Sequence, residues 1–224
     1  MSIIIENIQR PTSKLIERFK KVSPCELGHE LEFGFVSSEL RPFIEKLHFA
    51  GPALTVRIPP NDSTMVYKAL DLAKPGDVIV VDMQGETRHA CWGEVTTLTA
   101  INKGLVGAII DGPITDKNEI KKMNFPVFAR CTSALTTKLL GYGGDINIPI
   151  QCGGVPVNPG DVVLANENGV LVIPLNLAED LIKLAEKAEE KDLIRKKRIK
   201  AKEPILEIMG INKIIEGMKI KKTN

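Results

Sequence analysis

Residues 106–130, VGAIIDGPITDKNEIKKMNFPVFAR, decide the fold class because they read as a strand, a helix and a second strand in succession. VGAIID (106–111) and FPVFAR (125–130) are apolar runs of strand length. Continuous apolar runs are typical of strands that are covered on both faces. The polar run DKNEIKKM (116–123) reads as the connecting helix. A strand, a helix and a strand in this order predict a parallel pair.

The same alternation extends upstream to residue 63. VIVVD (78–82) is a further apolar strand, and STMVYKALDLA (63–73) reads as the helix before it. EVTTLTAINKG (94–104) reads as a helix that Gly104 closes at its C-terminal end. Residues 63–130 therefore predict an α/β fold with at least partly parallel strands.

The pattern changes after residue 130. Residues 145–174 hold short apolar runs separated by glycine-containing turns, which predict short antiparallel strands. Residues 177–203 read as one long helix. Its buried face is predicted from the spacing of Leu177, Leu181, Leu184 and Ala188. Near the other end, residues 12–21 read as a helix with Thr12 or Ser13 as the N-cap.

The composition and charge of the chain indicate a globular protein with a sizeable core and limit its expected partners. The chain has 224 residues, 43% of them apolar, which is enough for a sizeable core. A formal net charge of +2 gives no reason to expect nucleic acid on the body of the protein. Four widely spaced cysteines without a CxxC pair predict reduced thiols in a cytoplasmic protein. Because no apolar stretch reaches the length of a bilayer span, no membrane partner is expected.

The basic tail is the one strongly charged segment. Residues 195–222 contain ten Lys or Arg and three Glu, a local charge of +7. A solvated helix face is the favoured interpretation, and a surface for an acidic partner or nucleic acid is the alternative. No aromatic residue interleaves the basic ones, so base stacking is not supported.

The candidate site lies around Gly93 and Asp116. In open α/β folds, ligands gather beyond the carboxyl ends of the strands. The first free amides of the helix predicted from Glu94 favour an anion such as a carboxylate, and Gly93 lets that anion approach the backbone closely. Glu94 and Asp116 supply the hard oxygen ligands that Mg²⁺ or Mn²⁺ prefers.

Asp116 has a second interpretation. With Glu119 three residues later it fits a variant of the capping box, in which both side chains bond to backbone amides at a helix start. Spacing alone leaves metal ligand and cap open, and a capping carboxylate can keep an oxygen for a metal. Asp82 and Asp111, which end two strands, are expected to stabilise turns. The glycine-rich GYGGD (141–145) lacks the strand and helix of a dinucleotide fingerprint, so no nucleotide cofactor is expected.

The ordered motifs PGDVIVVD, ACWGEVTTLTAINKGLVGAIIDGPITD, FPVFAR and CGGVPVNPGDVVLANENGVLVIP resemble the RraA-like family. That family includes the divalent-metal 4-hydroxy-4-methyl-2-oxoglutarate (HMG) aldolases and the regulator of ribonuclease E activity. The resemblance implies a three-layer β/β/α swivelling-domain fold, forming a homotrimer or hexamer with active sites between subunits. It also implies one domain over residues 1–224, with N-terminal helices at about 12–32 and a long helix plus basic tail at about 177–224.

The resemblance also assigns roles to residues. The aldolases carry an acidic residue, twenty intervening residues and then Arg-Asp, and here Glu94 and Thr115-Asp116 stand at those positions. Asp116 would be the direct metal ligand, and Glu94 would act through a metal-bound water. A substrate-binding turn would hold a pyruvate-like carboxylate on its amides: Gly93, Glu94, Val95 and Thr96. An acid from the C-terminal helix of the adjacent subunit would approach the metal shell, with Glu189 or Glu190 as the candidate.

Thr115 departs from the aldolase pattern. The arginine at that position in the aldolases helps to bind the pyruvyl end and to stabilise the enolate, whereas threonine cannot form a bidentate pair with a carboxylate. Losing such a contact to a developing oxyanion costs about 2.7–4 kcal/mol. Arg88, and after it Lys117, is the candidate for a replacement cation.

Three functional hypotheses follow. The leading one is a metal-dependent lyase of the class II aldolase or oxaloacetate decarboxylase type, acting on a small 2-oxo acid through a pyruvate enolate. The second is a non-catalytic trimer that docks on a protein partner in RNA degradation. The third is a related enzyme with a different oxo acid, in which Thr115 reshapes the pocket.

Overall fold

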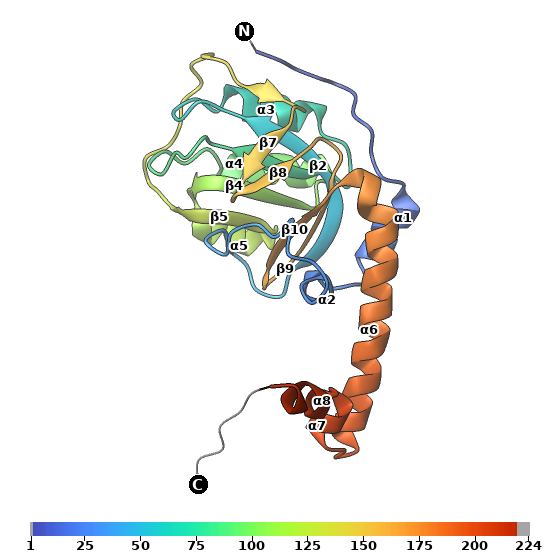
Figure 1. Cartoon of the computed structure of the whole chain (residues 1–224). Helices are drawn as coiled ribbons and strands as arrows, with labels where there is room; N and C mark the ends of the chain where they lie inside the picture. The colour runs from blue at the N-terminus through green and yellow to red at the C-terminus, as the bar shows by residue number, and fades with distance from the viewer. Residues whose placement is uncertain (1, 219–224) are drawn as a thin grey trace.

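The computed structural model describes residues 2–218 and has a mixed sheet at its centre (Figure 1). Its parallel part comprises β2 (His48–Arg57), β3 (Val78–Asp82), β4 (Gly107–Ile114) and β5 (Val127–Thr132). The connecting helices are α3 (Thr64–Leu72), α4 (Glu94–Asn102) and α5 (Lys117–Met123). The α/β alternation predicted for residues 63–130 is therefore confirmed.

Antiparallel strands extend the sheet at both ends. β1 (Arg41–Pro42) pairs with β5, while β9 (Val162–Asn166) and β10 (Gly169–Ile173) continue beyond β2. The sheet curls because β2 changes partner along its length: residues 48–52 pair with β9 and residues 53–57 with β3. The remaining strands are β6 (Asp145–Ile146), which pairs with the end of β2, and the hairpin of β7 (Ile150–Cys152) and β8 (Val155–Val157).

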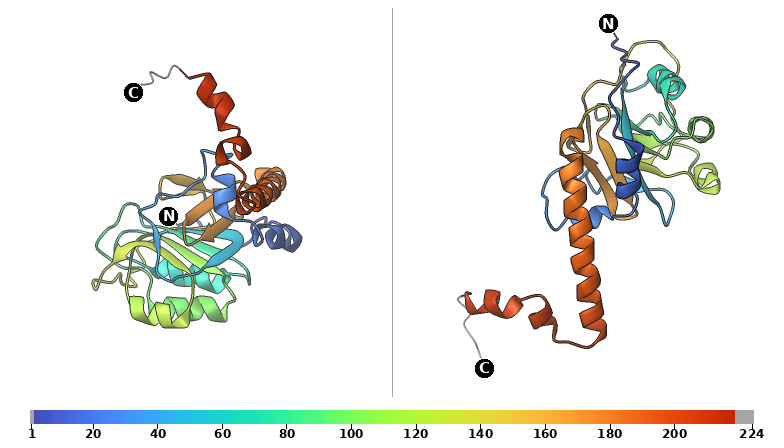
Figure 2. Two further views of the ribbon diagram at one scale, coloured as in Figure 1. Left: turned by 90° about the horizontal axis from the view of Figure 1, so that it is seen from below. Right: turned by 90° about the vertical axis from the view of Figure 1, so that its right-hand side faces the viewer.

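The parallel strands have a different layer on each face. Ile79 and Val81 of β3 pack with the core under α3, α4 and α5, whereas Val78 and Val80 pack toward β7–β8 and β9–β10. Two apolar faces on one strand explain the continuous apolar runs in the sequence. The three-layer β/β/α arrangement is visible in Figure 2, where the three connecting helices lie together on one side.

Three further helices cover the outer face of β9–β10: α1 (Ser13–Phe19), α2 (Pro24–Leu27) and α6 (Ala178–Lys200). Thr12 is the N-cap of α1, and its hydroxyl accepts a hydrogen bond from the Leu15 amide, as predicted. A short 3₁₀ turn (Leu175–Leu177) precedes α6.

The buried residues of α6 lie one position later in the chain than predicted. Its fully buried residues are Ala178, Ile182 and Ala185, while Leu181 and Leu184 are only half-buried beside them. Leu177 belongs to the preceding turn, so the helix starts one residue later than the pattern implied. The small side chains of Ala178 and Ala185 let α6 lie close against the strands beneath.

The far half of α6 projects from the body and carries α7 (Ile205–Ile208) and α8 (Ile211–Glu216) at its end (Figures 1 and 2). These elements contain most of the predicted basic tail, of which residues 219–222 lie outside the described residues. Within residues 2–218, no helix combines the length and the apolar character that crossing a bilayer requires.

Candidate functional site

A pocket of about 220 Å³ lies where four segments meet. These are the loop before α4, the first turn of α4, the end of β4 and the loop after β5. Six of the residues singled out in the sequence line it together: Gly93, Glu94, Val95, Thr96, Thr115 and Asp116. The fold therefore brings together two motifs that lie twenty residues apart in the chain.

Asp116 adopts a left-handed backbone conformation, with φ 51° and ψ 39°. An N-cap residue that bonds to its own helix normally has an extended backbone, and Asp116 makes no such side-chain bond to α5. The capping-box interpretation with Glu119 is therefore wrong. The strained conformation costs roughly 1–2 kcal/mol, and such strain concentrates at functional sites.

The Asp116 carboxylate instead binds the start of α4. Its Oδ2 accepts a hydrogen bond from the Glu94 amide at 2.9 Å, and its Oδ1 accepts one from the Thr115 hydroxyl at 3.2 Å. The carboxylate thus stabilises the N-terminus of the neighbouring helix rather than its own. Each oxygen accepts one protein hydrogen bond, which leaves further lone pairs on a carboxylate that lines the pocket.

The first turn of α4 supplies the pocket's free amides. Gly93 N donates to the Thr96 hydroxyl at 2.9 Å, and the Glu94 amide is held by Asp116. The amides of Val95 and Thr96 have no hydrogen-bond partner among the described residues. Two free amides at a helix N-terminus form a binding position for a carboxylate or another anion.

Gly93 is required by the close approach of Asp116. Its φ of −160° is open to any residue, but a Cβ there would lie 2.5 Å from Asp116 Oδ2 and 2.7 Å from Thr115 Cγ2. The missing side chain therefore makes room for the carboxylate beside the start of α4.

We expect Gly93→Ala to push the Asp116 carboxylate off the Glu94 amide and to destabilise the protein by about 1–3 kcal/mol, the usual cost of overpacking. Chemical denaturation measures the stability. The emission of Trp92, the only tryptophan, reports the local change. Gly217→Ala is the matched control, since a Cβ there meets no atom closer than 3.5 Å. A Gly93→Ala variant with unchanged stability and emission would contradict this packing.

Hydrogen bonds of Trp92 and Thr115 hold the pocket wall next to β4 in place. The Thr115 amide donates to Trp92 O at 2.8 Å, and Trp92 Nε1 donates to the Thr97 hydroxyl at 2.8 Å. Trp92 is buried, and these bonds connect the loop before α4 both to the end of β4 and to α4 itself. They hold the Thr115 side chain at the pocket wall beside Asp116.

Residues 136–139 form the opposite wall, which sequence reasoning missed. Thr136, Thr137 and Leu139 line the pocket from the loop after β5, and Tyr67 lines it from α3. This loop follows no periodic pattern, so nothing in the sequence predicts its position.

Buried Asp62 anchors this loop by accepting hydrogen bonds from the amides of Leu140 and Tyr142 and from Thr64. Burial alone would raise the pKa of Asp62. The bonds from the Thr64 hydroxyl and from the three amides outweigh that effect and lower its pKa. The ionised carboxylate therefore holds the loop in place at neutral pH.

Cys91 lines the same pocket and is buried. Burial raises the pKa of the Cys91 thiol to about 12. A thiol with that pKa stays protonated near neutral pH, so Cys91 lacks the thiolate that a nucleophile needs.

The other candidate residues do not line this pocket within one chain. Arg88 is exposed on the loop before it, and Lys117 lines a different cavity. Glu189 and Glu190 lie on α6, which packs on α1 and α2. Asp82 accepts from the Gln84 amide two residues later, which agrees with the turn-stabilising role predicted for it. The same prediction for Asp111 is wrong, because Asp111 lies within β4 and binds the distant Arg130 and the Gly153 amide.

The oxygen ligands of the pocket suit a hard divalent cation that keeps several bound waters. The pocket offers two carboxylates, Glu94 and Asp116. No group of three or more His, Cys, Asp or Glu able to hold a metal exists among residues 2–218. Mg²⁺ commonly takes one or two carboxylates and retains several waters, so this set suits it better than Zn²⁺, which needs a full set of protein ligands.

Comparison with known proteins gives consistent matches. The family model described as RraA-like, Aldolase/RraA, matches residues 24–172. A relative from Halalkalibacterium halodurans, named "Putative 4-hydroxy-4-methyl-2-oxoglutarate aldolase", is 37% identical over 183 residues, covering 82% of this chain and 84% of the relative.

Solved structures share the fold. Streptomyces coelicolor RraAS2, described as an unusual member of the RNase ES inhibitor RraA protein family, is 24% identical with a TM-score of 0.75, covering 85% of this chain and 99% of that chain. The RNA-processing inhibitor RraA from Thermus thermophilis is 25% identical with a TM-score of 0.58, covering 75% of this chain and 94% of that chain. The fold predicted from the sequence motifs is therefore confirmed.

Proposed function

The chain belongs to the RraA-like (Aldolase/RraA) family, and we propose that it is a divalent-cation-dependent lyase acting on a small 2-oxo acid. The observation that carries the proposal is the pairing of the Asp116 carboxylate with the start of α4, beside two free amides. A 2-oxo acid substrate needs a cation that polarises its 2-oxo group and backbone amides that bind its carboxylate. This pocket offers residues for both. The relative named as an HMG aldolase supports a lyase.

The substrate would bind through its carboxylate to the amides of Val95 and Thr96, with Gly93 leaving the approach open. Asp116 would hold Mg²⁺ or Mn²⁺, with Glu94 beside it. When bound, such a cation supplies Lewis-acid polarisation of a 2-oxo group. The Thr115 hydroxyl would orient the Asp116 carboxylate through the bond that it donates to Oδ1.

Carbon–carbon cleavage of HMG and decarboxylation of oxaloacetate both leave a pyruvate enolate, so one pocket can serve both reactions. The test is pyruvate release by the purified chain from each substrate, with Mn²⁺ or Mg²⁺ and with a chelator. We expect release that depends on the cation. A preparation that binds Mn²⁺ but releases no pyruvate from either substrate would refute these two substrates.

We propose Arg88 as the cation that replaces the aldolase arginine. Its carbonyl accepts a hydrogen bond from Ser133, and Ala90, two residues further on, lines the pocket. Arg88→Ala is then expected to lower kcat/KM at least about tenfold, because a charge-assisted hydrogen bond is lost. Arg195→Ala, an exposed arginine on α6, is the control. Unchanged turnover in Arg88→Ala would show that Arg88 does not replace the aldolase arginine.

We further propose that copies of the chain assemble as a homotrimer or hexamer over this pocket. Apolar side chains are exposed around it: Val95 is 64% exposed, Leu139 66% and Tyr142 69%. Exposed apolar clusters of this kind mark protein interfaces. No residue of α6 lines the pocket, so Glu189 or Glu190 could reach it only from a second copy. Light scattering on the purified chain measures the mass, and a monomer would contradict the assembly.

A non-catalytic regulator is the second candidate. Thr115 favours it, since the position lacks the aldolase arginine, and the similarity to the Thermus inhibitor gives it a precedent. A pull-down with RNA-degradation enzymes, combined with a Mn²⁺ titration, separates the candidates. Specific capture of such an enzyme without Mn²⁺ binding would favour the regulator.

A further inference from the structure

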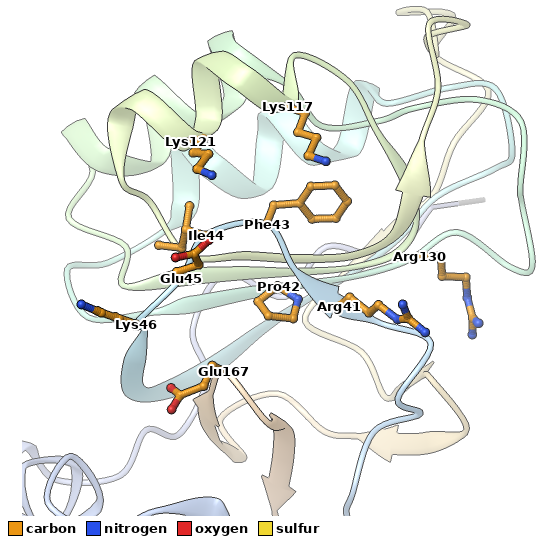
Figure 3. A pocket seen from close by; sticks show the side chains of 10 residues that line it. All are labelled: Arg41, Pro42, Phe43, Ile44, Glu45, Lys46, Lys117, Lys121, Arg130 and Glu167. Atoms are coloured by element: carbon orange, nitrogen blue, oxygen red, sulfur yellow. The ribbon is translucent and has the colours of Figure 1, made fainter.

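A second and larger cavity, of about 620 Å³, lies beside α5 (Figure 3). It is a groove between α5 and the segment of residues 41–46, which includes the edge strand β1. Its floor is apolar and is formed by Pro42, Phe43 and Ile44. None of its lining residues lines the candidate active-site pocket, so the groove is a separate site.

Cationic side chains from three segments surround this floor. They are Arg41, Lys46, Lys117, Lys121 and Arg130, against two acidic residues, Glu45 and Glu167. Arg130 is bound by Asp111 and Glu39. The other four have no ion-pair partner among the described residues. The groove therefore has an excess of uncompensated positive charge.

One of these cations occupies a position that α5 alone disfavours. Lys117 is the first residue of the helix, where the helix dipole opposes a positive charge. Lys121 lies in the last turn, where the dipole favours a positive charge, but at the i,i+4 spacing from Lys117 at which like charges repel. Figure 3 shows both side chains directed toward the segment of residues 41–46. Local rules of this kind are broken most often at functional sites, and the cost is compensated elsewhere in the structure.

Phe43 gives part of that compensation. The Lys117 ammonium lies 5.7 Å from the centre of the Phe43 ring, within the range of a cation–π contact. This contact holds Lys117 over the apolar floor rather than in bulk solvent. A ligand in the groove would therefore meet positive charge and apolar surface at the same place.

We propose that this groove binds a small organic anion with at least two negative charges and a flat apolar body, such as an aromatic dicarboxylate. Lys117 and Lys121 would bind one carboxylate, and Arg41, whose planar guanidinium suits a bidentate contact, would bind the other. Pro42 and Ile44 would pack against the ring. Lys117 directly follows Asp116, so the bound anion would lie next to the residue that holds the cation in the proposed active site.

Isothermal titration of the full-length chain with benzene-1,3-dicarboxylate tests the proposal. Benzoate has the ring with one charge, and succinate has two charges without the ring. We expect the aromatic dicarboxylate to bind about tenfold or more tightly than either, since only it uses both the charged groups and the apolar floor. Binding should weaken as salt is raised, because the lysines are exposed.

The variant K117Q/K121Q should weaken binding of the dicarboxylate about tenfold or more, since two charged contacts are lost. Lys122→Gln is the matched control. Lys122 lies on the same helix, does not line the groove, and its side chain is 78% exposed near Glu119. This control should change the affinity less than about twofold. Thermal unfolding verifies that each variant is folded.

Three results would overturn the proposal. One is the absence of binding by the folded wild-type chain. Another is an equal loss of affinity in Lys122→Gln and in K117Q/K121Q, which would indicate nonspecific attraction to a basic helix. The third is succinate binding as tightly as the aromatic dicarboxylate, which would show that the apolar floor does not contribute to binding. Because binding is measured without turnover, these results do not depend on the proposed lyase activity.

Discussion

Asp116→Asn should abolish cation binding in the candidate active site and lower kcat/KM for pyruvate release by about a thousandfold, or ~4 kcal/mol. The amide keeps an oxygen that can accept the hydrogen bond from the Glu94 amide, so the start of α4 stays supported. What the variant loses is the negative charge that a divalent cation requires. Calorimetry with Mn²⁺ and the pyruvate assay measure the two effects separately.

Glu119→Gln is the control for this experiment. Glu119 lies in the first turn of α5, only three residues from Asp116, but it does not line the pocket. It should therefore leave both Mn²⁺ affinity and turnover unchanged. If Asp116→Asn bound Mn²⁺ as the wild type does, Asp116 would be a structural residue that supports α4, and the proposed cation site would have to lie elsewhere.

The core of the fold could be predicted because its strands are covered on both faces. Such strands, like VIVVD and GAIID, are apolar at every position before the aspartate and can be recognised without knowing their neighbours. The partner change within β2 could not be predicted in the same way. It depends on how β9 returns to the sheet more than a hundred residues later, which no local pattern encodes.

The candidate site could be predicted in its residues but not in its geometry. Gly93 and Asp116 were expected near one another, and Asp116 does accept the Glu94 amide. The expected cap on α5 was wrong, because the left-handed conformation of Asp116 turns its carboxylate toward α4. The D-x-x-E spacing does not encode that conformation, so the spacing alone was misleading.

Thr115→Arg is the second change with a large expected effect. If this chain has lost efficiency on HMG through the missing arginine, restoring it should raise kcat/KM for HMG by about a hundred- to a thousandfold. Thr115 is half-buried at the pocket wall, and its amide is fixed by Trp92 O. A guanidinium on this position would extend into the pocket toward the carboxylate that Val95 and Thr96 are proposed to bind.

Thr115→Lys and Thr115→Val distinguish the possible causes of any gain in kcat/KM for HMG. Lysine adds the charge without the planar fork, so it should recover only part of the activity. Valine removes the hydroxyl that donates to Asp116 at nearly constant volume, and so tests what the native side chain contributes. A Thr115→Arg variant that folds, binds Mn²⁺ and shows no gain on HMG would mean that the missing arginine does not limit the reaction. The pocket would then be shaped for a different oxo acid, and a reduced rate of oxaloacetate decarboxylation in Thr115→Arg would point to that substrate class instead.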